Sequence, residues 1–125
     1  METLKNSINW FEIPVSNFER AKRFYSTIYD FEMPTQKMGP IDMGFLLVEQ
    51  GGIGGAIACG EGYEPSETGT LVYLNGGTDL QVILNRIEEA GGKVVVPKFK
   101  ITDEIGYCAF FIDTEGNKVG IHSMN

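Results

Sequence analysis

Glu12 and His122 are the two residues of this chain whose types suit acid–base chemistry. His122 is the only histidine, and an unperturbed imidazole changes its charge between about pH 5 and pH 8. A carboxylate beside it could exchange protons with a bound molecule together with the imidazole. The same two groups could instead form a buried ion pair that orders the core, or supply two ligands to a metal ion.

Alternation along the first apolar segment places Glu12 on the face opposite to the hydrophobic side chains. Phe11, Ile13 and Val15 form the apolar set, so Trp10 and Glu12 must point the other way in a strand. We expect the apolar set to pack against helices and the other face to line a cavity.

The last segment of the chain has the same alternation. Val119 and Ile121 form its apolar pair, so Gly120 and His122 share the opposite face. The pattern therefore predicts that both candidate acid–base groups face away from the main core.

The elements that position these residues come from an internal repeat with an offset of 62 residues. Ser16-Asn17-Phe18-Glu19 and Thr78-Asp79-Leu80-Gln81 both have the sequence of a capping box, which predicts the start of a helix. Apolar residues follow each box at helical spacing: Ala21, Phe24, Tyr25 and Ile28 in the first half, and Leu80, Ile83, Leu84 and Ile87 in the second. Gly91-Gly92 is expected to end the second helix.

Segments with strand character surround each predicted helix. They span Ile8–Val15, Phe31–Met38, Ile41–Glu49 and Ile53–Cys59 in the first half, and Thr70–Asn75, Lys93–Ile101, Ile105–Ile112 and Lys118–Ser123 in the second. The order is therefore β-α-β-β-β twice, with modules over about residues 7–60 and 70–123 and a polar link over about 60–69. Neither module can bury its apolar faces alone, so we predict a single α+β domain over residues 1–125 in which the two modules pair.

Four sequence stretches in this order resemble a known family: Trp10-Phe11-Glu12-Ile13-Pro14-Val15, Glu19-Arg20-Ala21, Phe24-Tyr25 and Asp113-Thr114-Glu115-Gly116-Asn117. The chain is similar over nearly its whole length to the vicinal-oxygen-chelate superfamily of glyoxalases, bleomycin-resistance proteins and extradiol dioxygenases, in the glyoxalase-like branch related to lactoylglutathione lyase. The resemblance implies that the modules form a half-open barrel of eight strands around a cup. It also implies a divalent metal in the cup, held by the first and last strand of each module.

The residues at the four implied ligand positions do not suit a metal. The resemblance places Trp10 and Gly120 at two of them, and the repeat then places the others near Gly55 and Leu71, within one residue of register. Zinc, nickel, manganese and iron need carboxylate, imidazole or thiolate ligands. We therefore expect no cofactor, and a divalent metal only if the chain has kept the enzymatic chemistry of the family.

Glu12 and His122 lie two residues beyond the lost ligand positions, in strands that the resemblance places close together. Trp10, Tyr73, Tyr107 and Phe111 are candidate ligand-pocket residues, and aromatic rings at alternate strand positions also commonly belong to the core. A structural ion pair, a proton-transfer pair and a shifted metal site remain open for Glu12 and His122.

Three functions follow from this pattern. The preferred one is metal-free binding of a small organic molecule in the cup, as in bleomycin-resistance proteins. The alternatives are a metal-dependent lyase, isomerase or dioxygenase-type enzyme related to lactoylglutathione lyase, and a metal-independent acid–base enzyme that uses Glu12 and His122. The resemblance also implies a homodimer.

The charge of the chain limits its partners. The net charge is -7 and the pI about 4.6, and such a chain repels phosphate backbones and anionic lipids. We therefore expect a small-molecule partner and neither nucleic acid nor a membrane. The first residues lack a signal peptide's apolar stretch, and Cys59 and Cys108 lack redox-motif spacing, which together predict a cytoplasmic protein with reduced cysteines.

Overall fold

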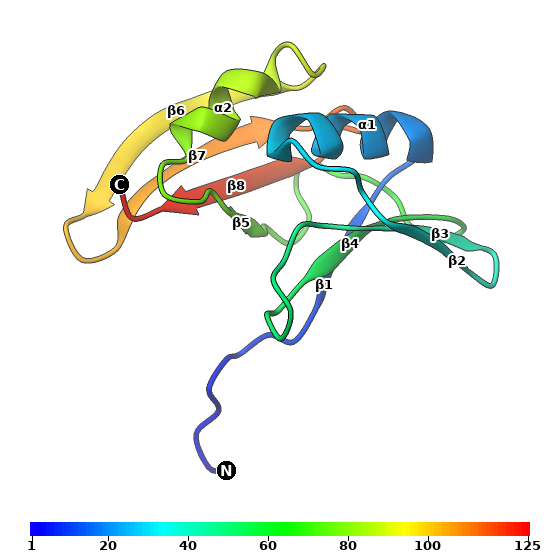
Figure 1. The fold of residues 1–125 in the computed structure, drawn as a ribbon, viewed down its shortest axis with the longest axis horizontal. Helices are drawn as coiled ribbons and strands as arrows, with labels where there is room; N and C mark the ends of the chain where they lie inside the picture. Colours follow the sequence, from blue (N-terminus) through cyan, green and yellow to red (C-terminus); the bar gives the residue numbers. More distant parts are fainter.

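The repeat predicted from the sequence is present as two βαβββ modules (Figure 1). The structure is a computed structural model that describes residues 1–125. The first module consists of β1 (Phe11–Pro14), α1 (Phe18–Tyr29), β2 (Thr35–Met38), β3 (Ile41–Phe45) and β4 (Gly55–Cys59). The second consists of β5 (Tyr73–Asn75), α2 (Gln81–Ile87), β6 (Lys93–Thr102), β7 (Gly106–Ile112) and β8 (Lys118–Ser123).

Both modules use the same strand order. The sheets are β1-β4-β3-β2 and β5-β8-β7-β6, so the first strand of each module pairs in parallel with the last strand of that module. The two four-stranded sheets are separate and do not close on each other. This α+β architecture agrees with the predicted half-open barrel.

The apolar faces of the helices join the modules. Both helices lie on one side of the sheets in Figure 1, and they contact each other. All the predicted helix-face residues are buried. One core cluster of 18 buried residues includes both helices and strands of both sheets, which is why neither module would bury its apolar surface alone.

The helix starts differ from the predicted capping boxes. Asn17 is the cap of α1, where its side-chain Oδ1 accepts a hydrogen bond from the backbone N–H of Arg20 at 3.0 Å. In front of α2, Asp79 Oδ1 accepts from the N–H of Gln81 at 2.9 Å. The cap of α1 therefore lies one position after the predicted Ser16, whereas the cap of α2 is Leu80, two positions after the predicted Thr78, and makes no side-chain capping bond.

Neither helix has the length and apolar character needed to span a membrane. Both cysteines are free, with Cys108 buried and Cys59 partly exposed.

Candidate functional site

The exposed face of the first sheet carries a cluster of one carboxylate and aromatic side chains. Glu12 of β1 accepts hydrogen bonds from the indole Nε1–H of Trp10 at 3.3 Å and from the hydroxyl of Tyr63 at 2.8 Å. The Trp10 ring also lies against Phe45 of β3, with ring centroids 6.1 Å apart and planes at 59°. We call Trp10, Glu12, Phe45 and Tyr63 the indole–carboxylate cluster.

Alternation in β1 explains why Glu12 lies on this face. Ile13 is 3% exposed and belongs to the main core, whereas Glu12 is exposed. In the neighbouring strand β4, Ala56 lies opposite Glu12, and its methyl group leaves room above the sheet for the larger side chains.

Tyr63 reaches the sheet from the link between the modules. The N–H of Tyr63 bonds to the carbonyl of Gly60 at 3.1 Å, and Gly62 has a φ of 91°, a conformation that glycine adopts without strain. This turn folds the link back so that Tyr63 packs on a small cluster of Met43, Ala56 and Ala58. The position of Tyr63 depends on this tertiary contact and has no signal in the strand pattern.

The carboxylate of Glu12 has no cationic partner. Four ion pairs occur in the structure, and none includes Glu12. Its donors are neutral, and the bond to the carboxylate raises the pKa of the Tyr63 hydroxyl. Each oxygen of Glu12 therefore accepts one hydrogen bond from a neutral donor, at an exposed, aromatic-lined position.

A groove of about 460 Å³ runs beside this cluster between β1, the link and the start of β8. Trp10 and Glu12 line it from β1, Glu64 and Thr70 from the link, and Lys118 from β8. The Lys118 ammonium lies over the Phe110 ring, 5.1 Å from its centroid, on the second sheet.

The corresponding face of the second sheet is aromatic. Tyr73 pairs with Gly120 across the sheet, and its ring packs on Phe110 with centroids 5.6 Å apart. A Cβ added at Gly120 would lie 2.7 Å from the Tyr73 ring, so glycine is what lets this ring lie flat on β8. Tyr73 and Leu71 also line a more apolar cavity of about 380 Å³.

The structure does not bring Glu12 and His122 together. His122 Nε2 lies 2.5 Å from the carbonyl oxygen of Ile105, and it lines a separate, open cavity of about 630 Å³ with Ile101 and Met124. The expected proximity fails because β8 pairs with β5, and β1 with β4. The two residues therefore lie in different sheets and share neither a hydrogen bond nor a groove.

Two of the four candidate pocket aromatics face the helices instead of the cup. Phe111 is fully buried, with its ring 5.9 Å from that of Phe24, and Tyr107 packs against the same core. The predicted direction was wrong here because β7 is apolar on both faces, so alternation could not distinguish them. Phe110, which the sequence analysis did not select, lies on the exposed face.

The implied metal-ligand positions also needed one correction. Gly55 pairs with Phe11, and a Cβ there would lie 2.4 Å from the Phe11 ring, so Gly55 faces the helices. Ala56 takes the place on the exposed face. Trp10, Leu71, Gly120 and Ala56 have no donor atom for a divalent ion, and no group of three or more His, Cys, Asp or Glu side chains is arranged to hold one. The residues present do not fit the family's metal.

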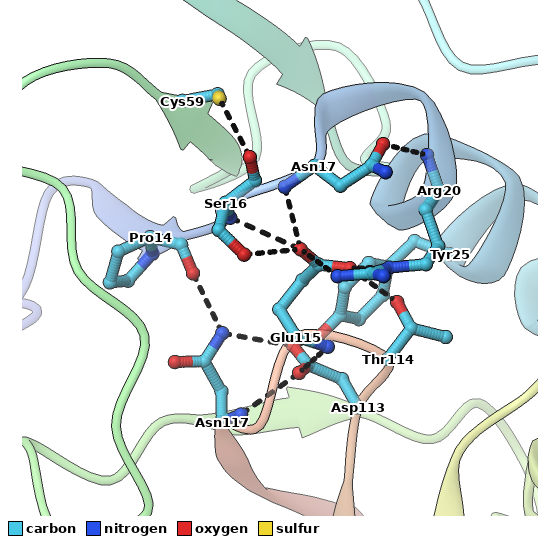
Figure 2. A network of polar contacts seen from close by, with 10 residues as sticks. All are labelled: Pro14, Ser16, Asn17, Arg20, Tyr25, Cys59, Asp113, Thr114, Glu115 and Asn117. Carbon is cyan, nitrogen blue, oxygen red and sulfur yellow. Dashed lines mark hydrogen bonds and ion pairs between the residues drawn. The ribbon is translucent and has the colours of Figure 1, made fainter.

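A polar network that the sequence analysis missed joins the start of α1 to the turn between β7 and β8 (Figure 2). The Oε1 of Glu115 accepts hydrogen bonds from the N–H of Asn17 at 2.8 Å and from the N–H and Oγ–H of Ser16 at 3.1 Å each. Arg20 Nε donates to Oε2 at 2.7 Å. Burial opposes ionisation of Glu115, but these donors together lower its pKa to about 2.

The residues beside Glu115 extend the network into the core. Tyr25 donates to Asp113 Oδ2 at 2.7 Å, and burial raises the pKa of its hydroxyl well above the usual value. Asn117 Nδ2 donates to the carbonyl of Pro14 at 2.7 Å and to Asp113 Oδ2 at 3.0 Å. No buried side-chain nitrogen or oxygen lacks a hydrogen-bond partner. The network holds the β7–β8 turn against the start of α1, and its role is structural.

The fold and the match of its sequence define the family. Residues 7–121 match the Glyoxalase/Bleomycin resistance protein/Dioxygenase superfamily, and the chain belongs to that family. It is 29% identical over 119 residues to a glyoxylase-like domain-containing protein of Didymella fabae, covering 91% of each chain.

Solved structures share the fold at low sequence identity. A glyoxylase/bleomycin resistance protein/dioxygenase domain from Frankia sp. EAN1pec superimposes with a TM-score of 0.70 at 17% identity, covering 94% of this chain and 97% of that one. TnmS3, an antibiotic-binding protein from Streptomyces sp. CB03234, has a TM-score of 0.64 at 22% identity, with 98% of both chains covered. Glyoxalase I of Zea mays has a TM-score of 0.65 at 14% identity, covering 92% of this chain and 43% of that one.

Proposed function

We propose that this protein binds a small organic molecule at the indole–carboxylate cluster and does so without a metal ion. The observation that carries the proposal is the hydrogen bond from Trp10 to Glu12. An indole occupies an implied metal-ligand position and is held, by the adjacent carboxylate, against the exposed face of the sheet.

The dimensions and lining of the adjoining groove suit this function. Its volume of about 460 Å³ lies in the range of roughly 300–1,000 Å³ that small-molecule sites occupy. Apolar side chains supply contact area, and Glu12, Thr70 and Lys118 supply a few polar groups that can orient a ligand. The antibiotic-binding neighbour supports the proposal, since this fold serves small-molecule binding there.

The two enzymatic alternatives have less support from the geometry. A metal-dependent reaction needs donor side chains at positions that Trp10, Ala56, Leu71 and Gly120 occupy. A metal-independent reaction by Glu12 and His122 needs both groups at one substrate, and they lie in separate sheets.

We further propose that the protein forms a homodimer, as the family resemblance implies. The edge strand β6 exposes Val95, Phe99 and Ile101 at 39–42% of their surface, and an apolar exposed edge is unfavourable in a monomer. Light scattering coupled to gel filtration tests this directly, and a monomeric mass at micromolar concentration would contradict it.

Trp10 provides the test of the binding proposal because it is the only tryptophan. Titration of chelator-treated protein with a panel of neutral and charged aromatic compounds should produce a saturable change in indole emission for some members. Calorimetry on the same compounds should give matching affinities, and Trp10→Ala should abolish binding.

Metal analysis forms the second arm of this experiment. Protein purified without chelators should contain far less than one equivalent of zinc, nickel, manganese or iron. A stoichiometric metal that is required for binding would overturn the metal-free proposal.

A further inference from the structure

We propose that the indole–carboxylate cluster selects organic cations, with a compact ammonium group placed beside Glu12 and over the ring of Trp10. This inference rests on the proposed function and names the chemical class of its ligand. Four observations carry it: a carboxylate without an ion-pair partner, aromatic side chains in contact with it, the angle between two of the rings, and the charges of the groove lining.

The first observation is the state of Glu12. Its two hydrogen-bond donors are the neutral Trp10 and Tyr63, and none of the ion pairs in the structure includes it. A carboxylate has about four lone-pair sites, and two neutral donors occupy only part of them, so its oxygens can still contact a ligand cation. A cationic ligand would supply the missing counter-charge, whereas an anionic ligand would meet repulsion.

The second observation is that two aromatic side chains contact this carboxylate and a third lies next to them. Trp10 and Tyr63 bond to it directly, and Phe45 packs against Trp10. A cation within about 6 Å of an aromatic centroid is attracted by the ring quadrupole, most strongly for tryptophan. The indole turns its N–H edge toward Glu12, so an ammonium group that lies over the Trp10 ring face, next to Glu12, would gain from the ring and from the carboxylate together.

The third observation is the angle between the rings. A planar ligand sandwiched between two rings needs parallel ring planes. These planes must be roughly 7 Å apart, because the ligand makes one carbon contact of about 3.5 Å with each ring. Trp10 and Phe45 are 6.1 Å apart with planes at 59°, so they form a corner and leave no slot. A corner of this kind suits a compact, roughly spherical ammonium head better than a flat ring.

The charges around the groove agree with this selection. Glu64 lines the same groove and adds to the negative potential, in a chain of net charge -7. Lys118 is the only basic residue of the lining, and its ammonium lies over the Phe110 ring. It forms no ion pair with Glu12, so the carboxylate is not already paired with the lysine of the groove.

The test compares three probes of similar size and different charge: benzyltrimethylammonium, benzyl alcohol and benzoate. Calorimetry at low ionic strength should show the cation binding about tenfold more tightly than the alcohol, a difference consistent with a partly exposed cation–π and charge contact. Benzoate should bind most weakly. Equal affinities for the three probes, or tighter binding of benzoate, would overturn the inference.

Variants separate the local contact from the overall charge. Glu12→Gln should weaken the cation by about tenfold and leave benzyl alcohol within about twofold, which also shows that the site is still folded. Glu61→Gln removes the same charge from an exposed position of the link and should change neither affinity. An equal loss in both variants would mean that net charge, not the cluster, selects the cation, and would overturn the inference.

Tyr63 separates the ring from its hydroxyl. Tyr63→Phe should keep the cation affinity within about twofold, whereas Tyr63→Leu should lower it severalfold because only the latter removes a ring face. Equal behaviour of the two variants would contradict the aromatic part of the inference. If benzyl alcohol binds as well as the cation throughout, small-molecule binding stands and cation selection fails; if no probe in this set or in the wider neutral panel binds, the proposed function itself fails.

Discussion

Glu12 and Glu115 are two glutamates with opposite surroundings in one small domain. The Glu115 side chain is inaccessible to solvent, pairs with Arg20 and accepts backbone N–H groups at the start of α1. Glu12 is exposed, lacks a cation and contacts aromatic rings. The first arrangement satisfies the carboxylate within the protein and stabilises the fold, whereas the second leaves part of it available to a ligand.

The comparison separates structural from functional acids by their partners. A buried carboxylate is stable only when its acceptors are occupied, and Glu115 meets this condition through contacts 95–99 residues away along the chain. An exposed carboxylate needs no protein partner, so its placement among aromatic residues calls for a different explanation. The predictions below test whether the two acids differ as this contrast requires.

The largest expected effect is loss of stability in Glu115→Ala. Removing the carboxylate leaves the N–H groups of Ser16 and Asn17 and the Arg20 guanidinium without their acceptor, and breaking such a network costs about 2–3 kcal/mol after allowance for the half-exposed Arg20. Urea unfolding measures the change. The matched variant Glu12→Ala should lower the free energy of unfolding by no more than about 0.5 kcal/mol. Equal losses in the two variants would contradict the claim that Glu115 stabilises the fold and Glu12 does not.

The next largest effect concerns Tyr25, which supports the same network from the core. Tyr25→Phe keeps the ring and removes the hydroxyl that donates to Asp113. A buried acceptor that loses one donor costs about 1–2 kcal/mol. Tyr63→Phe removes the analogous hydroxyl from Glu12 and should be nearly neutral for urea unfolding, because that carboxylate is exposed; a comparable loss there would show that the cluster is structural.

The pH dependence of stability should report on the network around Glu115. The folded-state pKa of Glu115 is about 2, below the ordinary value of 4.5, so its contribution to stability is complete above about pH 5 and disappears as the pH falls toward 2. Glu115→Gln should therefore flatten the decline in stability between about pH 5 and pH 2 relative to the wild type. A decline as steep in Glu115→Gln as in the wild type would contradict this role of Glu115.

The smallest expected effect concerns Gly120 on the second sheet. An added Cβ would meet the Tyr73 ring at 2.7 Å, and Tyr73 is 51% exposed, so the ring can move aside. Gly120→Ala should therefore cost only about 1 kcal/mol, with no effect on binding at the first sheet. Loss of ligand binding in this variant would show that both sheets contribute to one site.

The sequence predicted the elements of the fold well because its patterns are local. The repeat of helix faces, such as Phe24 with Tyr25 and Ile83 with Leu84, matches the buried faces observed. Alternation in β1 correctly separated Ile13 from Glu12. These signals need only the period of a helix or a strand.

The site was less predictable because it depends on pairing between distant segments. Alternation placed Glu12 and His122 on exposed faces, but the sheet to which each strand belongs decides whether two such residues meet. β7 is apolar on both faces, so Phe110 and Phe111 could not be assigned. Tyr63 and Glu115 act through long-range contacts that no local spacing indicates.

The indole N–H resonance of Trp10 offers the most direct test of the central claim, since a nitrogen–proton correlation spectrum of this protein contains a single tryptophan side-chain signal. Titration of chelator-treated protein with benzyltrimethylammonium should shift this signal saturably. The ligand would contact both the indole ring and the Glu12 carboxylate, which accepts a hydrogen bond from the indole N–H. The midpoint of this titration should move to about tenfold higher ligand concentration in Glu12→Gln and stay unchanged in Glu61→Gln. A signal that stays in place until a divalent metal is added would contradict metal-free binding at this cluster.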